Sequence, residues 1–165
     1  MKLNNKKGFT LVELLAVIVI LAVVMLIAVT AVGPMMTKSR KSALGVEGVG
    51  AVDAAKAAFQ AEQLNSESGI TPTSTVCFPI KYLCDEGYFE KGCTGSGDGY
   101  DGSVLVQHGE GGKFTYRFSI TNGSYYFVDE NVNDYNPDSA GEVEESVGCG
   151  VYSVPEGVYI LEVGD

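Results

Sequence analysis

The chain has 165 residues and a formal net charge of −10 at pH 7. The acidic excess lies beyond residue 41, where five basic residues stand against twenty acidic ones. Lys and Arg are needed to neutralise phosphates, so this composition argues against direct nucleic-acid binding by a single chain. The sequence also has no nucleophile elbow, no phosphate-binding loop and one histidine, His108, beside a glycine turn. We therefore predict no enzymatic activity.

A short basic leader opens the sequence, and a long apolar segment follows it. The leader contains Lys2, Lys6 and Lys7 and ends at Gly8, and the apolar segment covers residues 11–32. At about 1.5 Å per residue this segment spans roughly 33 Å as a helix, which is enough to cross a bilayer. The lysines favour a cytoplasmic N-terminus. We predict one membrane-spanning helix, with the rest of the chain exported.

Glu13 is the only charged residue inside the apolar segment. A carboxylate at such a position costs about 2.5–3.5 kcal/mol on insertion scales, so an intramembrane acid indicates a functional site. The segment offers no cationic side chain to balance it. We therefore expect the partner of Glu13 to come from another molecule.

The stretch KKGFTLVELL at residues 6–15 resembles the processing site of the type IV pilin family, which includes the pseudopilins of type II secretion and the competence pilins. In that family a membrane peptidase cuts after the glycine and methylates the new N-terminus. The resemblance thus implies cleavage between Gly8 and Phe9 and N-methylation of Phe9. It also implies an assembly role for Thr10 and Glu13, in which Glu13 pairs with the terminal amine of a neighbouring subunit.

Other N-terminal signals explain the segment less well. A secretory signal peptide has a shorter apolar stretch, with its cleavage site after that stretch rather than before it. A plain single-pass anchor explains the length and the lysines but not Glu13.

The resemblance implies a structural subunit of a type IV pilus-like filament. Its implied partners are itself and other pilins, the prepilin peptidase/N-methyltransferase, the membrane assembly platform and the cytoplasmic membrane. The subunit is expected first as a single-pass prepilin in that membrane and then in an extracellular surface filament. Two alternatives stay open: a pseudopilin of a type II secretion or DNA-uptake system, and a membrane-anchored binding module.

We expect an α+β fold in three parts: a leader at 1–8, a hydrophobic helix at 9–41 and a head domain at 42–165. Gly45, Gly48 and Gly50 lower the helix propensity locally. A helical apolar pattern then resumes over residues 51–64. The distal half of one long N-terminal helix is expected to pack against an antiparallel sheet of about four strands. A further short helix is expected within 79–89.

Strand patterns fill the second half of the head domain, at residues 103–107, 113–120, 151–154 and 158–163. Within 113–120 the aromatic and aliphatic side chains alternate and should share one face, namely Phe114, Tyr116, Phe118 and Ile120. Asn122-Gly123 predicts a type I′ hairpin turn. In that hairpin Ile120 would face Tyr125, with Phe127 on the same side.

Four cysteines lie in the predicted exported part, and their even number predicts two disulfides. Their spacing lacks the CxxC pair of a zinc site. Three pairings are possible. We expect Cys77–Cys84, which is local, and Cys93–Cys149, which would fasten the C-terminal region to the middle of the domain.

The acidic stretch at 129–145 opens like a calcium loop, but Asp134 stands where the EF-hand glycine belongs and Ala140 where the final glutamate belongs. The stretch is therefore not an EF-hand. A looser calcium site is a candidate, formed by Asp129, Asn131, Asp134 and Asp138. We expect no other cofactor.

Overall fold

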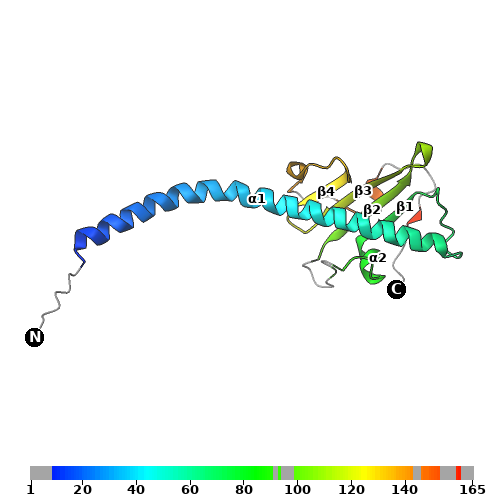
Figure 1. Cartoon of the computed structure of the whole chain (residues 1–165), viewed down its shortest axis with the longest axis horizontal. Helices are drawn as coiled ribbons and strands as arrows, with labels where there is room; N and C mark the ends of the chain where they lie inside the picture. Colours follow the sequence, from blue (N-terminus) through cyan, green and yellow to red (C-terminus); the bar gives the residue numbers. More distant parts are fainter. Residues whose placement is uncertain (1–8, 91–92, 94–98, 143–145, 153–158, 161–165) are drawn as a thin grey trace, which may run out of the picture. The chain divides into compact units, whose positions relative to one another are not determined.

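The computed structural model describes residues 9–90, 93, 99–142, 146–152 and 159–160. The chain divides into two compact units, Met1–Ser39 and Arg40–Asp165. The long helix α1 (Leu11–Leu64) begins in the first unit and ends in the second (Figure 1). The predicted leader, residues 1–8, lies outside the described residues.

The first unit is the apolar part of α1. Its large apolar side chains are exposed on every side of the helix, from Leu11 to Met36. By length and composition, α1 is the one helix among the described residues that could cross a membrane. The predicted membrane-length segment is therefore a helix whose apolar side chains are not covered by the rest of the chain. A helix that is apolar on all sides needs an apolar environment, such as a membrane.

The second unit is built on a five-stranded sheet with the order β4-β3-β2-β1-β5 (Figure 1). Its first four strands are antiparallel, and β5 pairs in parallel with β1. The predicted α+β fold is therefore confirmed, with one short strand added. The strands are β1 (Val76–Pro79), β2 (Asp101–His108), β3 (Phe114–Thr121), β4 (Tyr126–Asn131) and β5 (Tyr159–Ile160).

Short helices connect these strands, and they correct part of the sequence prediction. The short helix expected within 79–89 is α2 (Ile80–Asp85). The strand expected at 151–154 begins instead in a 3₁₀ helix, η3 (Cys149–Val151), and residues 153–154 lie outside the described part. Two further 3₁₀ helices are η1 (Glu110–Gly112) and η2 (Pro137–Ser139).

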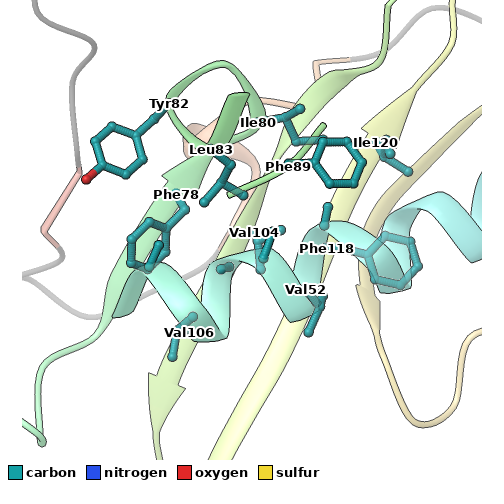
Figure 2. Packing of buried hydrophobic residues seen from close by; sticks show 14 of the residues in the cluster. Val52, Phe78, Ile80, Tyr82, Leu83, Phe89, Val104, Val106, Phe118 and Ile120 are labelled. Atoms are coloured by element: carbon teal, nitrogen blue, oxygen red, sulfur yellow. The ribbon is translucent and has the colours of Figure 1, made fainter. Parts of the chain in front are cut away.

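The main core lies between the second half of α1 and one face of the sheet, here called the inner face. Val52 of α1 lies among Val104, Phe118 and Ile120, all fully buried (Figure 2). The predicted alternation in β3 is confirmed, because Phe114, Tyr116, Phe118 and Ile120 all join this cluster.

Two of the helix glycines are explained by this packing. A Cβ atom on Gly48 would lie 2.4 Å from the ring of Phe118, and one on Gly45 would lie 2.4 Å from the ring of Tyr135. Aromatic rings therefore rest directly on the backbone of α1. The lower helix propensity of glycine is offset by contacts that no other residue type permits.

The β3–β4 hairpin forms where Asn122-Gly123 predicts it, but the predicted register is wrong by two residues. Thr121 pairs with Tyr126, and Ile120 pairs with Phe127. Side chains build this four-residue loop: Oδ1 of the Asn122 side chain accepts from the backbone amides of Ser124 and Tyr125. Within the loop only Gly123 has a positive φ. Because a shift of two residues preserves the face, Phe127 still points into the core.

The predicted disulfide pairing is also wrong: the bridges are Cys77–Cys149 and Cys84–Cys93. The cause is β1, which the sequence patterns did not reveal. On β1, Cys77 points to the opposite, outer face of the sheet and packs with Leu105 and Tyr152. Cys84 on α2 packs against the main core, as does Cys93. The two cysteines of the expected local pair therefore lie on opposite sides of the sheet.

Candidate functional site

Hydrogen bonds join Thr10 and Glu13 at the start of α1. Glu13 Oε2 accepts from the Thr10 amide at 2.9 Å and from the Thr10 hydroxyl at 3.0 Å. The Glu13 amide donates back to Thr10 Oγ1 at 3.3 Å. Thr10 is thus the N-cap of α1, and Glu13 is its third residue. This reciprocal arrangement is a capping box, which satisfies amides that have no partner in the first turn of a helix.

The capping box adds a contact that the sequence analysis missed, and the charge partner expected from another molecule stays a prediction. The apolar segment has no cation to pair with Glu13, but Thr10, just before the segment, supplies two hydrogen bonds to one carboxylate oxygen. The signal was present in the sequence, because a Thr followed three residues later by Glu, just before an apolar run, is typical of this motif. It also gives Thr10 a definite role, that of holding the Glu13 side chain in place.

Among the described residues, the carboxylate of Glu13 has hydrogen bonds on one oxygen only. Both hydrogen bonds from Thr10 end on Oε2, and no other group in the described part of the chain donates to Oε1. Phe9 precedes the cap and is 86% exposed. Gly8, the other half of the predicted cleavage site, lies outside the described residues. The site can accept an ammonium group from another molecule.

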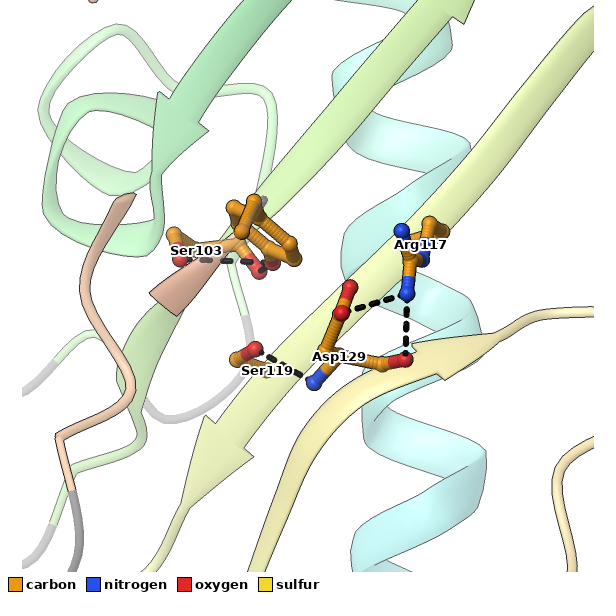
Figure 3. Close-up of polar contacts among 5 residues, drawn as sticks. Ser103, Arg117, Ser119 and Asp129 are labelled. Carbon is orange, nitrogen blue, oxygen red and sulfur yellow. Dashed lines mark hydrogen bonds and ion pairs between the residues drawn. The ribbon is translucent and has the colours of Figure 1, made fainter. Parts of the chain in front are cut away.

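A second polar group lies on the outer face of the sheet (Figure 3). The Arg117 guanidinium forms an ion pair with Asp129, and the Asp129 amide donates to Ser119 Oγ at 2.9 Å. Asp129 has a φ of 57° and lies where the β3–β4 register shifts. Burial raises the pKa of the Asp129 carboxyl, and the Arg117 charge opposes that rise.

Tyr152 completes this outer-face group. Its hydroxyl donates to the Ser103 carbonyl at 2.7 Å, and the Ser103 hydroxyl donates to the Val147 carbonyl at 2.7 Å. Burial raises the pKa of the Tyr152 phenol to about 12. These bonds, with the Cys77–Cys149 bridge, fasten residues 146–152 across the sheet. The arrangement holds residues 146–152 against the outer face of the sheet.

The calcium candidates are engaged in local contacts. Asp129 binds Arg117, which a metal ion would have to displace. Asn131 Oδ1 accepts from the Asn133 amide at 2.9 Å, and Asp134 is exposed in the following turn. Asp138 lies in η2. Within the described ranges, no three His, Cys, Asp or Glu side chains gather so as to hold a metal ion. Calcium binding there stays a prediction.

Comparison with known proteins identifies the N-terminal site. A model of the prokaryotic N-terminal methylation motif matches residues 3–29. This motif supports a protein of the type IV pilin or pseudopilin kind, and it confirms the resemblance seen in the sequence. The motif and the exposed apolar helix together fit a membrane-anchored prepilin and a structural role rather than an enzymatic one. Searches of curated proteins and of solved structures found no significant match.

Proposed function

We propose that this chain is a structural subunit of a type IV pilus-like filament. The prepilin peptidase cleaves between Gly8 and Phe9 and methylates the new amine of Phe9. The subunit waits in the cytoplasmic membrane through its apolar helix, and an assembly platform then moves it into a filament of copies of itself and other pilins. The observation that carries this proposal is the position of Glu13 at the start of an exposed apolar helix, where Thr10 caps the helix and no other described residue donates to Glu13 Oε1.

The capping box suggests how the Glu13 carboxylate is accommodated first in the membrane and then in the filament. In the membrane, Thr10 hydrogen bonds reduce the cost of a carboxylate in an apolar medium. In the filament, Oε1 accepts the amine of Phe9 from a neighbouring subunit, without loss of the bonds on Oε2. An ion pair in a low-dielectric core is costly to break because each charge is then left unpaired. The pair therefore sets the axial register between neighbours.

The mass of the mature protein tests the processing step. Loss of residues 1–8 together with one added methyl group supports the proposal, whereas an intact Met1 contradicts it. Electron microscopy of material sheared from the cell surface separates a long pilus from a short pseudopilus of a secretion or DNA-uptake system.

Two substitutions at Glu13 test the assembly step. Glu13→Gln keeps a side-chain acceptor for the capping box but removes the charge, and Glu13→Val removes both. We expect both variants to insert into the membrane and both to lose most of their filaments, measured by immunoblot of the sheared and membrane fractions. Thr10→Ser, which keeps the cap, is the matched control and should assemble normally. Abundant normal filaments from Glu13→Gln would show that the ion pair does not drive assembly.

A further inference from the structure

The turn of the β3–β4 hairpin contains a motif that neither the core nor the N-terminal site uses. Asn122 and Gly123 form the tip of this turn, and both residues are exposed, as is Ser124. Apart from its chain neighbours, a Cβ built on Gly123 would meet no described atom within 4 Å, so the turn is open to solvent. An asparagine followed by glycine can lose its side-chain amide. The glycine nitrogen is close enough along the chain to attack the asparagine Cγ atom, and no side chain crowds that nitrogen.

The hydrogen bonds of the turn hold the Asn122 side chain beside the next peptide group. Asn122 Oδ1 accepts from the Ser124 amide at 3.1 Å and from the Tyr125 amide at 3.0 Å. The ring that the first of these bonds closes includes both Asn122 Cγ and the Gly123 nitrogen. The two atoms that must react are therefore held within one small ring, which lowers the entropic cost of bringing them together.

The same two amides lie where the negative charge of the reaction develops. Attack on Asn122 Cγ turns the carbonyl oxygen Oδ1 into an oxyanion, and both amides already donate to this oxygen. Hydrogen-bond donors within about 2.7–3.1 Å of a developing oxyanion stabilise the transition state. The turn thus provides a small oxyanion site that is made of backbone groups.

A hydroxyl group lies beside the attacking nitrogen. The Gly123 amide donates to Thr121 Oγ1 at 3.1 Å, and the Thr121 hydroxyl donates in turn to the Tyr125 carbonyl at 2.9 Å. The Gly123 nitrogen must lose its proton to become a nucleophile, so an acceptor at this place helps to pass that proton to solvent. The leaving nitrogen is not held in place, because no described residue accepts a hydrogen bond from Asn122 Nδ2.

We propose that Asn122 is a site of spontaneous deamidation and that the folded turn promotes this reaction. The Gly123 nitrogen forms a bond to Asn122 Cγ, and its proton passes to solvent by way of the Thr121 hydroxyl. The bond between Cγ and Nδ2 breaks as Nδ2 takes up a proton and leaves as ammonia. Water then opens the resulting succinimide at either of its two carbonyl carbons and yields aspartate or isoaspartate. Each event adds one negative charge to the tip of the hairpin.

The two products affect the hairpin differently. Aspartate keeps an oxygen at the Oδ1 position, so the bonds from the Ser124 and Tyr125 amides remain and become charge-assisted. Isoaspartate puts one extra carbon atom into the backbone before Gly123, so the four-residue turn must rearrange. The proposal does not depend on the filament function, because the reaction takes place within one chain.

Comparison of folded and unfolded chain tests the proposal. The purified full chain is incubated at mildly alkaline pH, one sample folded in detergent and one reduced and unfolded in guanidinium chloride. Mass spectrometry of the peptide that contains Asn122 follows the exchange of NH for O, and chromatography separates the aspartate and isoaspartate forms. We expect Asn122 to react about tenfold faster in the folded chain. An equal or slower rate in the folded chain overturns the proposal.

Asn65 is the internal control in both samples. Its Oδ1 also accepts a backbone amide, from Glu67 at 3.1 Å, but Ser66 follows it in place of a glycine. We expect Asn65 to react slowly whether the chain is folded or unfolded. A rise on folding at Asn65 as large as that at Asn122 would overturn the role given to the hairpin turn.

A matched pair of variants at Thr121 tests the proton acceptor. Thr121→Ser keeps the hydroxyl and should react at the rate of the wild type. Thr121→Val keeps the branched shape without the hydroxyl and should react about threefold more slowly. Hydrogen exchange at the Tyr125 amide checks that the turn persists in both variants. A wild-type rate in Thr121→Val overturns the assignment of Thr121 as the acceptor.

Discussion

The two faces of the sheet are covered in different ways. The inner face is covered by α1, and its cluster contains twenty buried residues, including Phe78, Val104 and Phe118. The outer face is covered by residues 146–152, and among the described residues its cluster has three buried members, Cys77, Leu105 and Tyr152. Within the described part of the chain, the outer face therefore buries less apolar surface than the inner face. A covalent bridge and hydrogen bonds to Ser103 supply what burial does not.

This difference shows how a small exported domain can stabilise both faces of one sheet. The inner face depends on close packing. Gly45 and Gly48 have no side chains, so aromatic rings pack directly against the backbone of α1 at these two positions. The outer face depends on tethering, since the cover is a short segment with one 3₁₀ turn. Each mechanism predicts a different response to mutation.

The largest effect should come from removal of the outer tether. Cys77→Ser/Cys149→Ser opens a bridge with a sequence separation of 72, worth about 4 kcal/mol in the chain-entropy model. Cys84→Ser/Cys93→Ser opens one with a separation of 9, worth about 2.5 kcal/mol in the same model. We expect the first pair to lose more stability in urea denaturation. It should also lose protection of the β2 amides against hydrogen exchange. Equal losses from both pairs would mean that the outer face does not depend on its tether.

Peptide mapping without reduction gives a direct check of the same bridges. A peptide that joins the Cys77 and Cys149 regions, and another that joins Cys84 and Cys93, are expected. A peptide that joins Cys93 to Cys149 would contradict the structural pairing and restore the pairing expected from the sequence.

A matched pair of glycine substitutions tests the close fit of the inner face. Gly48→Ala places a methyl group 2.4 Å from the Phe118 ring. The ring is packed in the core and has little room to move away, so we expect the free energy of unfolding to fall by about 1–3 kcal/mol. Gly50→Ala meets only an ordinary contact with Phe89, at 3.6 Å, and should gain about 0.5–1 kcal/mol from better helix propensity. Thermal unfolding of the two variants measures both. No loss of stability from Gly48→Ala would show that Gly48 is not required for packing.

The sequence predicted the parts of the molecule that depend on local pattern. The run of apolar residues at 11–32 was enough to predict the exposed helix, and the alternation through Phe118 and Ile120 was enough to assign the inner face of β3. Thr10 and Glu13 could have been read as a capping box from their spacing alone.

The parts that failed depend on contacts between distant segments. β1 (Val76–Pro79) is buried on both faces over most of its four residues, so it shows no alternation that a sequence pattern could detect. Without β1 the side of the sheet occupied by Cys77 was unknown, and the disulfide pairing followed wrongly from local distance. The prediction of the hairpin register failed because two side-chain hydrogen bonds stabilise a longer turn: the Thr121 hydroxyl donates to the Tyr125 carbonyl, and Asn122 Oδ1 accepts from the Tyr125 amide.

The smallest effect concerns the hydrogen bonds of the outer face, and its pH dependence has a definite sign. Tyr152→Phe removes the bond to the Ser103 carbonyl and should cost about 1 kcal/mol near neutral pH. In the folded chain the pKa of the Tyr152 phenol is raised to about 12, whereas an unfolded tyrosine ionises near its model value of 10.0. Between pH 10 and pH 12, the Tyr152 phenol therefore keeps its proton in the folded state and loses it in the unfolded state. The stabilisation by Tyr152 is present in full below pH 10 and is lost as the pH rises toward 12.

Comparison of wild type and Tyr152→Phe isolates this group from the other tyrosines. Urea midpoints measured at several pH values between 8 and 11 should converge as the pH rises, because only the wild type loses the Tyr152 contribution. A constant difference across that range would show that the Tyr152 hydroxyl titrates normally and is open to solvent. In that case residues 146–152 would be held over the outer face by the Cys77–Cys149 bridge alone, and the contrast between the two faces would be sharper than the hydrogen bonds suggest.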